Sequence, residues 1–163
     1  MNKETLLLLD SLGRPRDHVL GILEGLSDEQ LRTPVLPSGW TCLGLVRHLA
    51  VDVEHYWFRG ITAGEPLKAD GDSDERSGAW QVEPNESAED VFTLYRDEIA
   101  RANAIVSDTP LHAPPRQRDP WWGNWEVPDL RFILLHVIAE TACHAGHLDA
   151  ARELLDGHQW LVL

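Results

Sequence analysis

The segment from Asp129 to Gly157 constrains this chain more than any other, because it reads as one long amphipathic helix. Asp129 suits the N-cap and Gly157 suits the C-terminal stop. At a rise of about 1.5 Å per residue, the helix would be roughly 40 Å long. A helical wheel places a set of apolar residues on one side, which we expect to face a core. They are Ile133, Val137, Leu148, Ala151, Leu154 and Leu155.

Four polar residues fall in the middle of that apolar side: His136, Glu140, His144 and His147. A carboxylate buried without a partner costs several kcal/mol or becomes protonated. A divalent cation removes the conflict, because it binds neutral imidazole nitrogen and ionised carboxylate oxygen together. Glu140 and His144 lie one turn apart and can reach the same ion, with His147 as a further ligand or a residue beside the ligands. The competing interpretation is a polar core whose members only hydrogen bond to one another.

Helix spacing supplies two or three ligands at most, so a metal site needs another ligand from elsewhere in the chain. A second apolar stripe predicts a helix over 42–59, with Thr41 as its N-cap. His48 lies at the edge of that stripe and is the favoured ligand, and His55 is a weaker candidate. Asp52, one turn after His48, either orients the free nitrogen of that ring or is a solvated surface carboxylate.

Two further segments have helical periodicity. Residues 3–26 carry helix-spaced leucines, and Pro15 predicts a kink or a short break within them. Ser27 and Gln30 have the spacing of a capping box before a single short turn of helix.

The remaining helix begins after Ser87, with Asp90 at the capping-box position, and ends near residues 107–110. The connections 60–86 and 108–128 read as loops, and no segment alternates like a strand of useful length. We therefore predict an all-α fold, a four-helix bundle with long connections in which residues 1–163 form a single domain.

The charge balance argues against several classes of partner. The chain has 27 acidic and 14 basic residues, a net charge of −13, which repels nucleic acid and anionic lipid. No apolar run reaches the length of a membrane span, which is about 18 residues, and the N-terminus lacks the pattern of a signal peptide. Cys42 and Cys143 form no CxxC motif and are expected to stay reduced in the cytoplasm.

The connection 108–128 combines prolines, which forbid regular structure, with Trp121, Trp122 and Trp125. So long and aromatic a loop is either a lid on a substrate pocket or a plug that closes one end of the bundle. Arg116 is a candidate contact for an anionic substrate, against the alternative that it faces solvent. The apolar tail after Trp160 favours docking on its own domain or on a second copy in a homodimer.

The segments SGWTCLGLVRHLAVDVEHYWF (38–58) and LRFILLHVIAETACHAGHLDAARELLDG (130–157) resemble the DinB/YfiT-like superfamily. The likeness is closest to its mycothiol-dependent maleylpyruvate isomerase-like branch. It implies a divalent ion held by His48, Glu140 and His144, with glutamate where many members have histidine. Zinc is the expected ion, and nickel, iron and manganese are alternatives. The resemblance also implies a low-molecular-weight thiol as cosubstrate.

Several functions are consistent with this pattern. The resemblance favours a metal-dependent S-transferase or isomerase that uses a mycothiol-type thiol on a small electrophile. A metal-dependent hydrolase that activates water is the second reading, with His147 or Asp52 as its base because Glu140 would be a ligand. The third is a non-catalytic metal-binding module of a stress response, and the fourth is a metal-free bundle.

Overall fold

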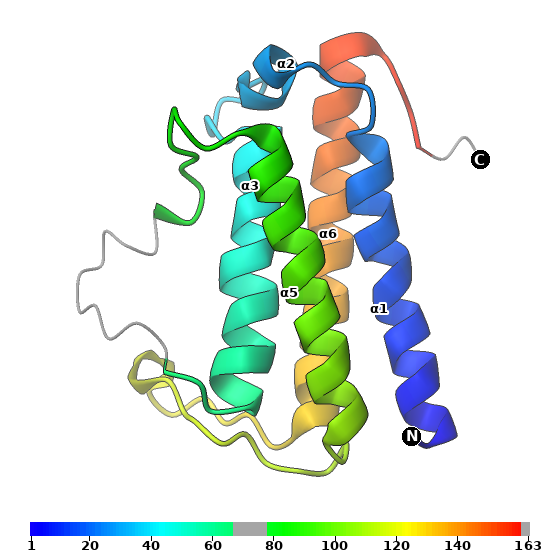
Figure 1. The fold of residues 1–163 in the computed structure, drawn as a ribbon, viewed down its shortest axis with the longest axis vertical. Coiled ribbons are helices and arrows are strands. Elements are labelled where there is room, and N and C mark those ends of the chain that lie inside the picture. Colours follow the sequence, from blue (N-terminus) through cyan, green and yellow to red (C-terminus); the bar gives the residue numbers. More distant parts are fainter. Residues whose placement is uncertain (67–77, 161–163) are drawn as a thin grey trace.

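The computed structural model describes residues 1–66 and 78–160, and these residues form helices and loops without a strand. Figure 1 shows long helices packed side by side, with a short helix crossing one end. The all-α prediction is confirmed. The elements are α1 (Lys3–Ile22), α2 (Asp28–Arg32), α3 (Cys42–His48), η1 (Leu49–Thr62), α5 (Ala88–Asp108), η2 (Pro120–Trp122) and α6 (Leu130–Asp156).

The predicted helix starts are confirmed by their caps. The Thr41 hydroxyl accepts from the Gly44 N–H at 3.0 Å, and Asp129 accepts from the Phe132 N–H at 3.0 Å. Both capping boxes, at α2 and at α5, are complete. Gly157 ends α6 in the left-handed conformation (φ 79°) that glycine adopts without steric cost.

The break predicted at Pro15 is wrong, because α1 continues through it. Pro15 forfeits one backbone hydrogen bond. The neighbouring Leu12, Arg16 and Val19 are nevertheless buried, so tertiary packing holds the helix on both sides of the proline. The helix ends at Ile22 and not at residue 26.

The second predicted helix is longer than expected and changes type. After His48 the α-helix α3 continues directly into η1, a π-helix that ends at Thr62. Its wider turns are visible where the Ala63 N–H donates to Phe58 O at 2.9 Å and the Thr62 hydroxyl donates to Trp57 O at 2.8 Å, each five residues back. A π-helix is rare and often occurs at functional sites.

The buried side of α6 is not centred where the helical wheel placed it. Leu130, Leu134, Thr141, Ala145 and Arg152 are buried in addition to the predicted apolar residues, whereas Leu154 is 60% exposed. These residues move the centre of the buried side about 80° around the helix from Glu140. The polar residues of α6 therefore lie along one edge of the core rather than in its middle.

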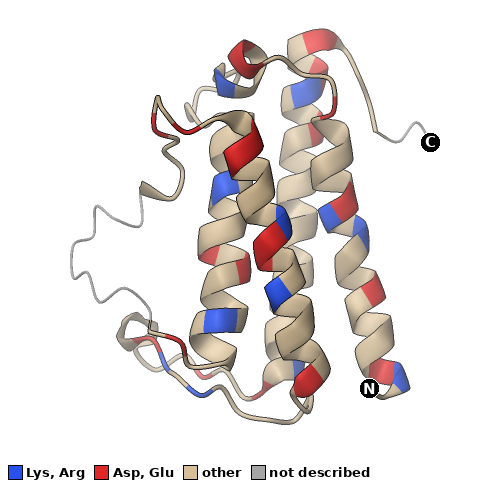
Figure 2. Cartoon of the chain, viewed as in Figure 1, with Lys and Arg blue, Asp and Glu red and all other residues tan. Residues whose placement is uncertain are grey.

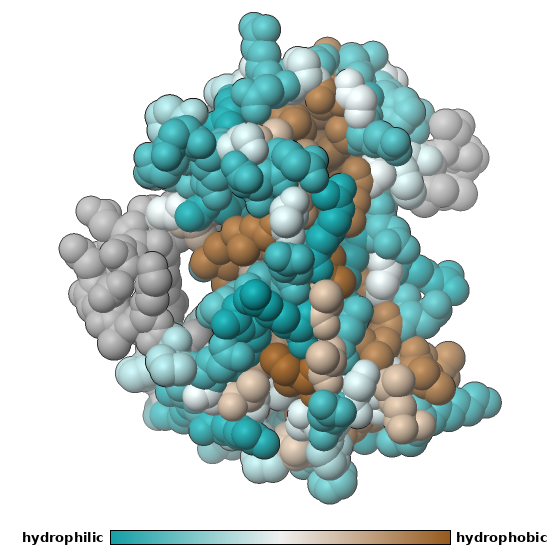
Figure 3. Space-filling view, viewed as in Figure 1, coloured by the Kyte–Doolittle hydropathy of each residue, from teal (hydrophilic) through white to brown (hydrophobic). Residues whose placement is uncertain are grey.

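Figure 3 shows apolar patches broken up by hydrophilic residues on one face of the molecule, and Figure 2 shows acidic and basic residues interspersed along the helices. The C-terminal Trp160 packs on its own chain, where its ring stacks on His18 at 5.2 Å. Residues 161–163 of the tail lie outside the described part, and the homodimer stays a prediction.

An ion pair lies inside the bundle and joins three of its helices. The Arg16 guanidinium of α1 donates to both Glu54 oxygens of η1, with Nε···Oε1 at 2.7 Å, and to Asn103 Oδ1 of α5 at 2.9 Å. The side chains of Arg16 and Glu54 are 3% and 1% exposed. Burial raises the pKa of Glu54 above its ordinary value, although the adjacent Arg16 opposes that shift.

Truncating either partner of this pair should be strongly destabilising, because it leaves the other polar group buried and unpaired. We expect Arg16→Ala and Glu54→Ala each to lower the free energy of unfolding by about 3–5 kcal/mol in urea titrations. Arg14→Ala is the matched control on the same helix. Its ion pair with Asp10 is exposed, so a loss of less than about 1 kcal/mol is expected. Equal losses in Arg14→Ala and Arg16→Ala would contradict the assignment.

Candidate metal centre

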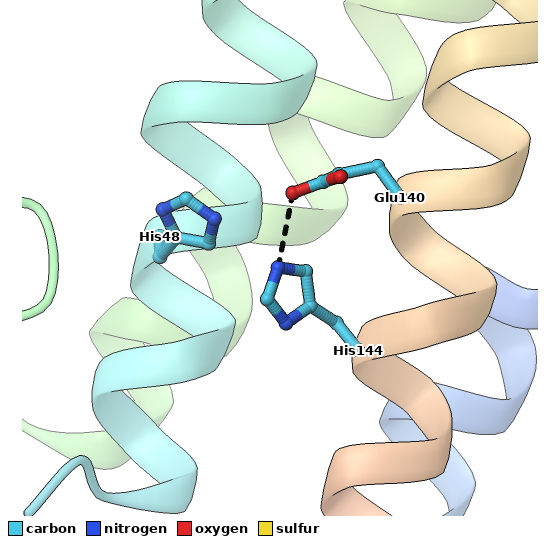
Figure 4. Close-up of side chains that lie close together, drawn as sticks. All are labelled: His48, Glu140 and His144. Carbon is cyan, nitrogen blue, oxygen red and sulfur yellow. Dashed lines mark hydrogen bonds and ion pairs between the residues drawn. The ribbon is translucent and has the colours of Figure 1, made fainter. Parts of the chain in front are cut away.

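Three predicted ligands come together where α3 faces α6 (Figure 4). One ligand atom from each of His48, Glu140 and His144 lies within 4.8 Å of the other two. His144 Nε2 is 3.1 Å from Glu140 Oε1, and the rings of His48 and His144 have centroids 5.1 Å apart. Glu140 and His144 lie one turn apart on α6, and His48 is the last residue of α3 before the helix widens. This spacing allows one ion to be shared by all three side chains.

The His48 ring has one nitrogen that is held and one that is free. Its Nδ1 is 2.9 Å from Asp52 Oδ2, so Asp52 fixes the orientation of the ring rather than lying in solvent as a lone carboxylate. Its Nε2 is buried and has no hydrogen-bond partner in the described part of the chain. A buried polar atom without a partner costs about 1–3 kcal/mol, and a metal–nitrogen bond would remove that cost. The residues present therefore fit a divalent ion.

The protonation state of His144 and the exposure of the three side chains also suit a metal ion. Burial lowers the pKa of His144, and the charge of His48 lowers it further, which favours the neutral imidazole that binds metals. The side chains of His48 and His144 are only 13% and 12% exposed, whereas Glu140 is 38% exposed. The site is thus closed on the histidine side and open beside the carboxylate.

The remaining histidine candidates lie outside this triad. His147 is exposed, and its Nδ1 lies 3.4 Å from His144 Nδ1, so it contacts a candidate ligand from the outer side. His55 turns towards α5, where its Nδ1 is 3.5 Å from Glu98 Oε2. The ring of His136 packs against Trp57 at 4.7 Å.

Two of the loop tryptophans pack onto the bundle, next to His136. Trp122 stacks on Trp57 with centroids 5.6 Å apart, and Trp125 meets the same ring edge-on at 5.9 Å. These contacts agree with the plug interpretation for Trp122 and Trp125. Trp121 is 68% exposed, and Arg116 is exposed while its backbone N–H donates to Ile61 O at 3.0 Å.

Sequence reasoning missed Trp80, which covers one face of the candidate site. Its ring stacks on His48 with centroids 4.2 Å apart and meets His144 edge-on at 5.8 Å. Trp80 lies in the connection 60–86, which has no helical or strand periodicity that could have indicated its position. The signal available was the tryptophan itself, a large apolar residue in a polar loop.

A family model described as Mycothiol-S-transferase matches residues 7–157. The chain belongs to the mycothiol S-transferase family. This membership confirms the expected DinB/YfiT-like superfamily, and it agrees with the helical fold and with the triad between α3 and α6. No curated protein and no solved structure matches the chain. Among the described helices, none combines the length and apolar character needed to cross a lipid bilayer.

If the triad holds the metal, single substitutions within it change the metal content of the protein. We expect His48→Ala, Glu140→Ala and His144→Ala each to lose most of the bound divalent metal, because two side chains seldom hold such an ion tightly. Elemental analysis of the purified proteins measures this directly. His136→Ala and His147→Ala are matched controls on α6 and should keep the wild-type metal content. A triad variant with unchanged metal content would remove that residue from the ligand set.

The two cysteines differ in their exposure. Burial raises the pKa of Cys42 to about 11, and Cys143 is exposed on α6. A buried, protonated thiol reacts slowly with alkylating agents. We expect iodoacetamide at neutral pH to label Cys143 and to leave Cys42 unmodified in the folded protein, as measured by mass spectrometry of peptides. Labelling of Cys42 at a rate similar to that of Cys143 would contradict its burial.

Proposed function

We propose that this protein is a metal-dependent S-transferase that joins a mycothiol-type thiol to a small electrophile. The observation that carries the proposal is the buried Nε2 of His48, which has no partner among residues 1–66 and 78–160 and faces Glu140 and His144, in a chain of the mycothiol S-transferase family. An isomerase that uses the same thiol is the nearest variant of this proposal. Zinc is the favoured ion, because the nitrogen and oxygen donors suit it, with nickel, iron and manganese as alternatives.

In this proposal His48, Glu140 and His144 are the residues that would hold the ion. A divalent ion in such a site supplies Lewis acidity, which lowers the pKa of a bound thiol from about 8.5 and raises the thiolate fraction at neutral pH. Asp52 keeps the His48 ring in the orientation that directs Nε2 into the site. The exposed side of Glu140 is the direction from which two small molecules would approach.

The proton of the incoming thiol needs an acceptor near the site. His147 is the available group, since it is exposed and lies beside His144. Asp52 is already hydrogen bonded to His48, which makes it a positioning residue rather than a base. A metal-dependent hydrolase would need one of these two groups as a general base for water, so the hydrolase is the second candidate function.

An aromatic surface of the protein lies near the site and is available to the apolar part of the electrophile. His136 lies one turn before Glu140 on α6, and its ring touches Trp57 and Trp125. Aromatic side chains provide contact area for a planar or apolar molecule. Arg116 remains the proposed contact for an anionic group. In a non-catalytic metal-binding module, the triad would hold the ion, and the aromatic side chains and Arg116 would bind no substrate.

The proposal predicts that turnover depends on added thiol. Purified protein loaded with zinc should consume a chromogenic electrophile rapidly with mycothiol or a cysteine-based analogue, and at the uncatalysed rate without thiol. His144→Ala should lose most of the thiol-dependent rate. Consumption of an ester or amide substrate that is indifferent to thiol would favour the hydrolase. Metal binding with no turnover of either kind would favour the non-catalytic module.

A further inference from the structure

We propose that Trp80 is a positioning residue that clamps the His48 ring, and that Gly44 is the residue that allows it to do so. This inference rests on the proposed metal site and adds to it a role for the segment 78–80. It predicts that metal affinity depends on two residues that supply no ligand atom.

The first observation is the contact between the two rings. Trp80 lies on the face of His48 with centroids 4.2 Å apart and an angle of 17° between the planes. Asp52 contacts the same imidazole at its edge, through Nδ1 at 2.9 Å. A hydrogen bond in the ring plane and a stacked indole on the ring face together restrict both rotations of the side chain.

The second observation explains how the indole comes so close. A Cβ added to Gly44 would lie 2.3 Å from the carbonyl oxygen of Trp80, a distance that real Cβ atoms do not show. Gly44 lies one turn before His48 on α3. The missing side chain therefore lets the backbone of Trp80 rest on the helix beside the ligand, and any larger residue has to push that backbone away.

The third observation is that the segment is tied to the same helix by polar contacts. Arg47 Nη1 donates to Gly78 O at 2.9 Å and to Ala79 O at 3.2 Å. Arg47 also forms an ion pair with Glu86 at 3.2 Å, on the far side of Trp80 in the chain. Ala79 is buried, with 4% of its surface exposed. The backbone is thus held in place both before and after Trp80 in the chain.

These contacts have two consequences for a bound ion. A ligand whose orientation is fixed before binding loses less conformational freedom, so the ion is held more tightly. The indole also covers the histidine side of the site, which leaves the side of Glu140, 38% exposed, for a thiol and an electrophile. Trp80 supplies no ligand atom, so its effect on a bound metal acts through the His48 ring on which it stacks.

The chain offers a matched control on α1. Trp160 stacks on His18 at 5.2 Å with an angle of 16°, and its ring occupies the space that a Cβ on Gly21 would fill. The pair Trp160 and Gly21 therefore also combines a tryptophan stacked on a histidine with a glycine that makes room for it, although here the ring rather than the backbone of the tryptophan fills that space. Removing it reports the general effect of losing a tryptophan stacked on a histidine.

The test is the zinc affinity of purified variants, measured by competition with a chromophoric chelator. Trp80→Ala should weaken zinc binding by about 10- to 100-fold, which is typical for residues that orient a ligand. Trp80→Phe should restore part of the affinity, because a smaller ring can still stack. Gly44→Ala should weaken binding as Trp80→Ala does, although it removes no contact to His48 directly. Trp160→Ala and Gly21→Ala should bind zinc as the wild type does.

Several outcomes would overturn the inference. Wild-type affinity in Trp80→Ala would remove the clamp, and wild-type affinity in a folded Gly44→Ala would remove the role of Gly44. An equal loss in Trp160→Ala would mean that the effect is not specific to the site. Circular dichroism and urea unfolding of the metal-free proteins check that each variant is folded, and Trp80→Ala decides alone if Gly44→Ala is not. Unchanged zinc binding in His48→Ala would instead count against the proposed metal site itself.

Discussion

The helix formed by α3 and η1 carries two polar side chains, the buried Glu54 and the partly buried His48, whose need for partners shapes this bundle. Glu54 finds its partner within the protein, since Arg16 of α1 donates to both of its oxygens and Asn103 of α5 completes the contact. Within the part of the chain that the structure describes, His48 finds a partner for Nδ1 only, and its Nε2 is left buried towards α6. A four-helix bundle can hold either arrangement, but only the second leaves a buried nitrogen that a bound ligand would satisfy. One face of this helix is thus ion-paired with a neighbouring helix, and another face carries the candidate metal site.

The antiparallel packing of η1 against α6 places two clusters along a single interface. His48 meets His144 at one level, and Trp57 meets His136 at another, with Glu140 between them on α6. The two levels lie about 12 Å apart along α6. In the proposed function the first level holds the metal and the thiol, and the second offers aromatic surface to the electrophile. The likeness to the mycothiol S-transferase family extends over both levels, because it covers residues 7–157.

The change from α-helix to π-helix after His48 gives this interface its geometry. Wider turns carry Glu54, Trp57 and Arg59 towards α1, α6 and α5 respectively. The 3.6-residue periodicity of the sequence predicted a helix at this place, but it could not predict the widening. The contacts of η1 with three neighbouring helices join distant segments, and periodicity within one segment does not report them.

The sequence by itself determined the helices, their capped ends and the residues able to bind a metal. Caps at Thr41, Ser27, Ser87 and Asp129 are local interactions within a few residues, so they are readable without the fold. The candidate triad was also predicted, because Glu140 and His144 share one helix face and His48 lies at the edge of the apolar stripe of the helix 42–59. The helical wheel misplaced the core side of α6, since Thr141 and Arg152 are polar residues buried by their neighbours.

Only the tertiary structure decided which polar residues share the site. His147 and His136 lie on the same edge of α6 as the triad, yet one is exposed and the other packs among tryptophans. The position of Trp80 over His48 also belongs to the tertiary structure, because it depends on a close approach to Gly44 across 35 intervening residues and not on any periodicity. Spacing along a helix fixes neighbours one turn apart, whereas contacts between distant segments depend on how the whole bundle packs.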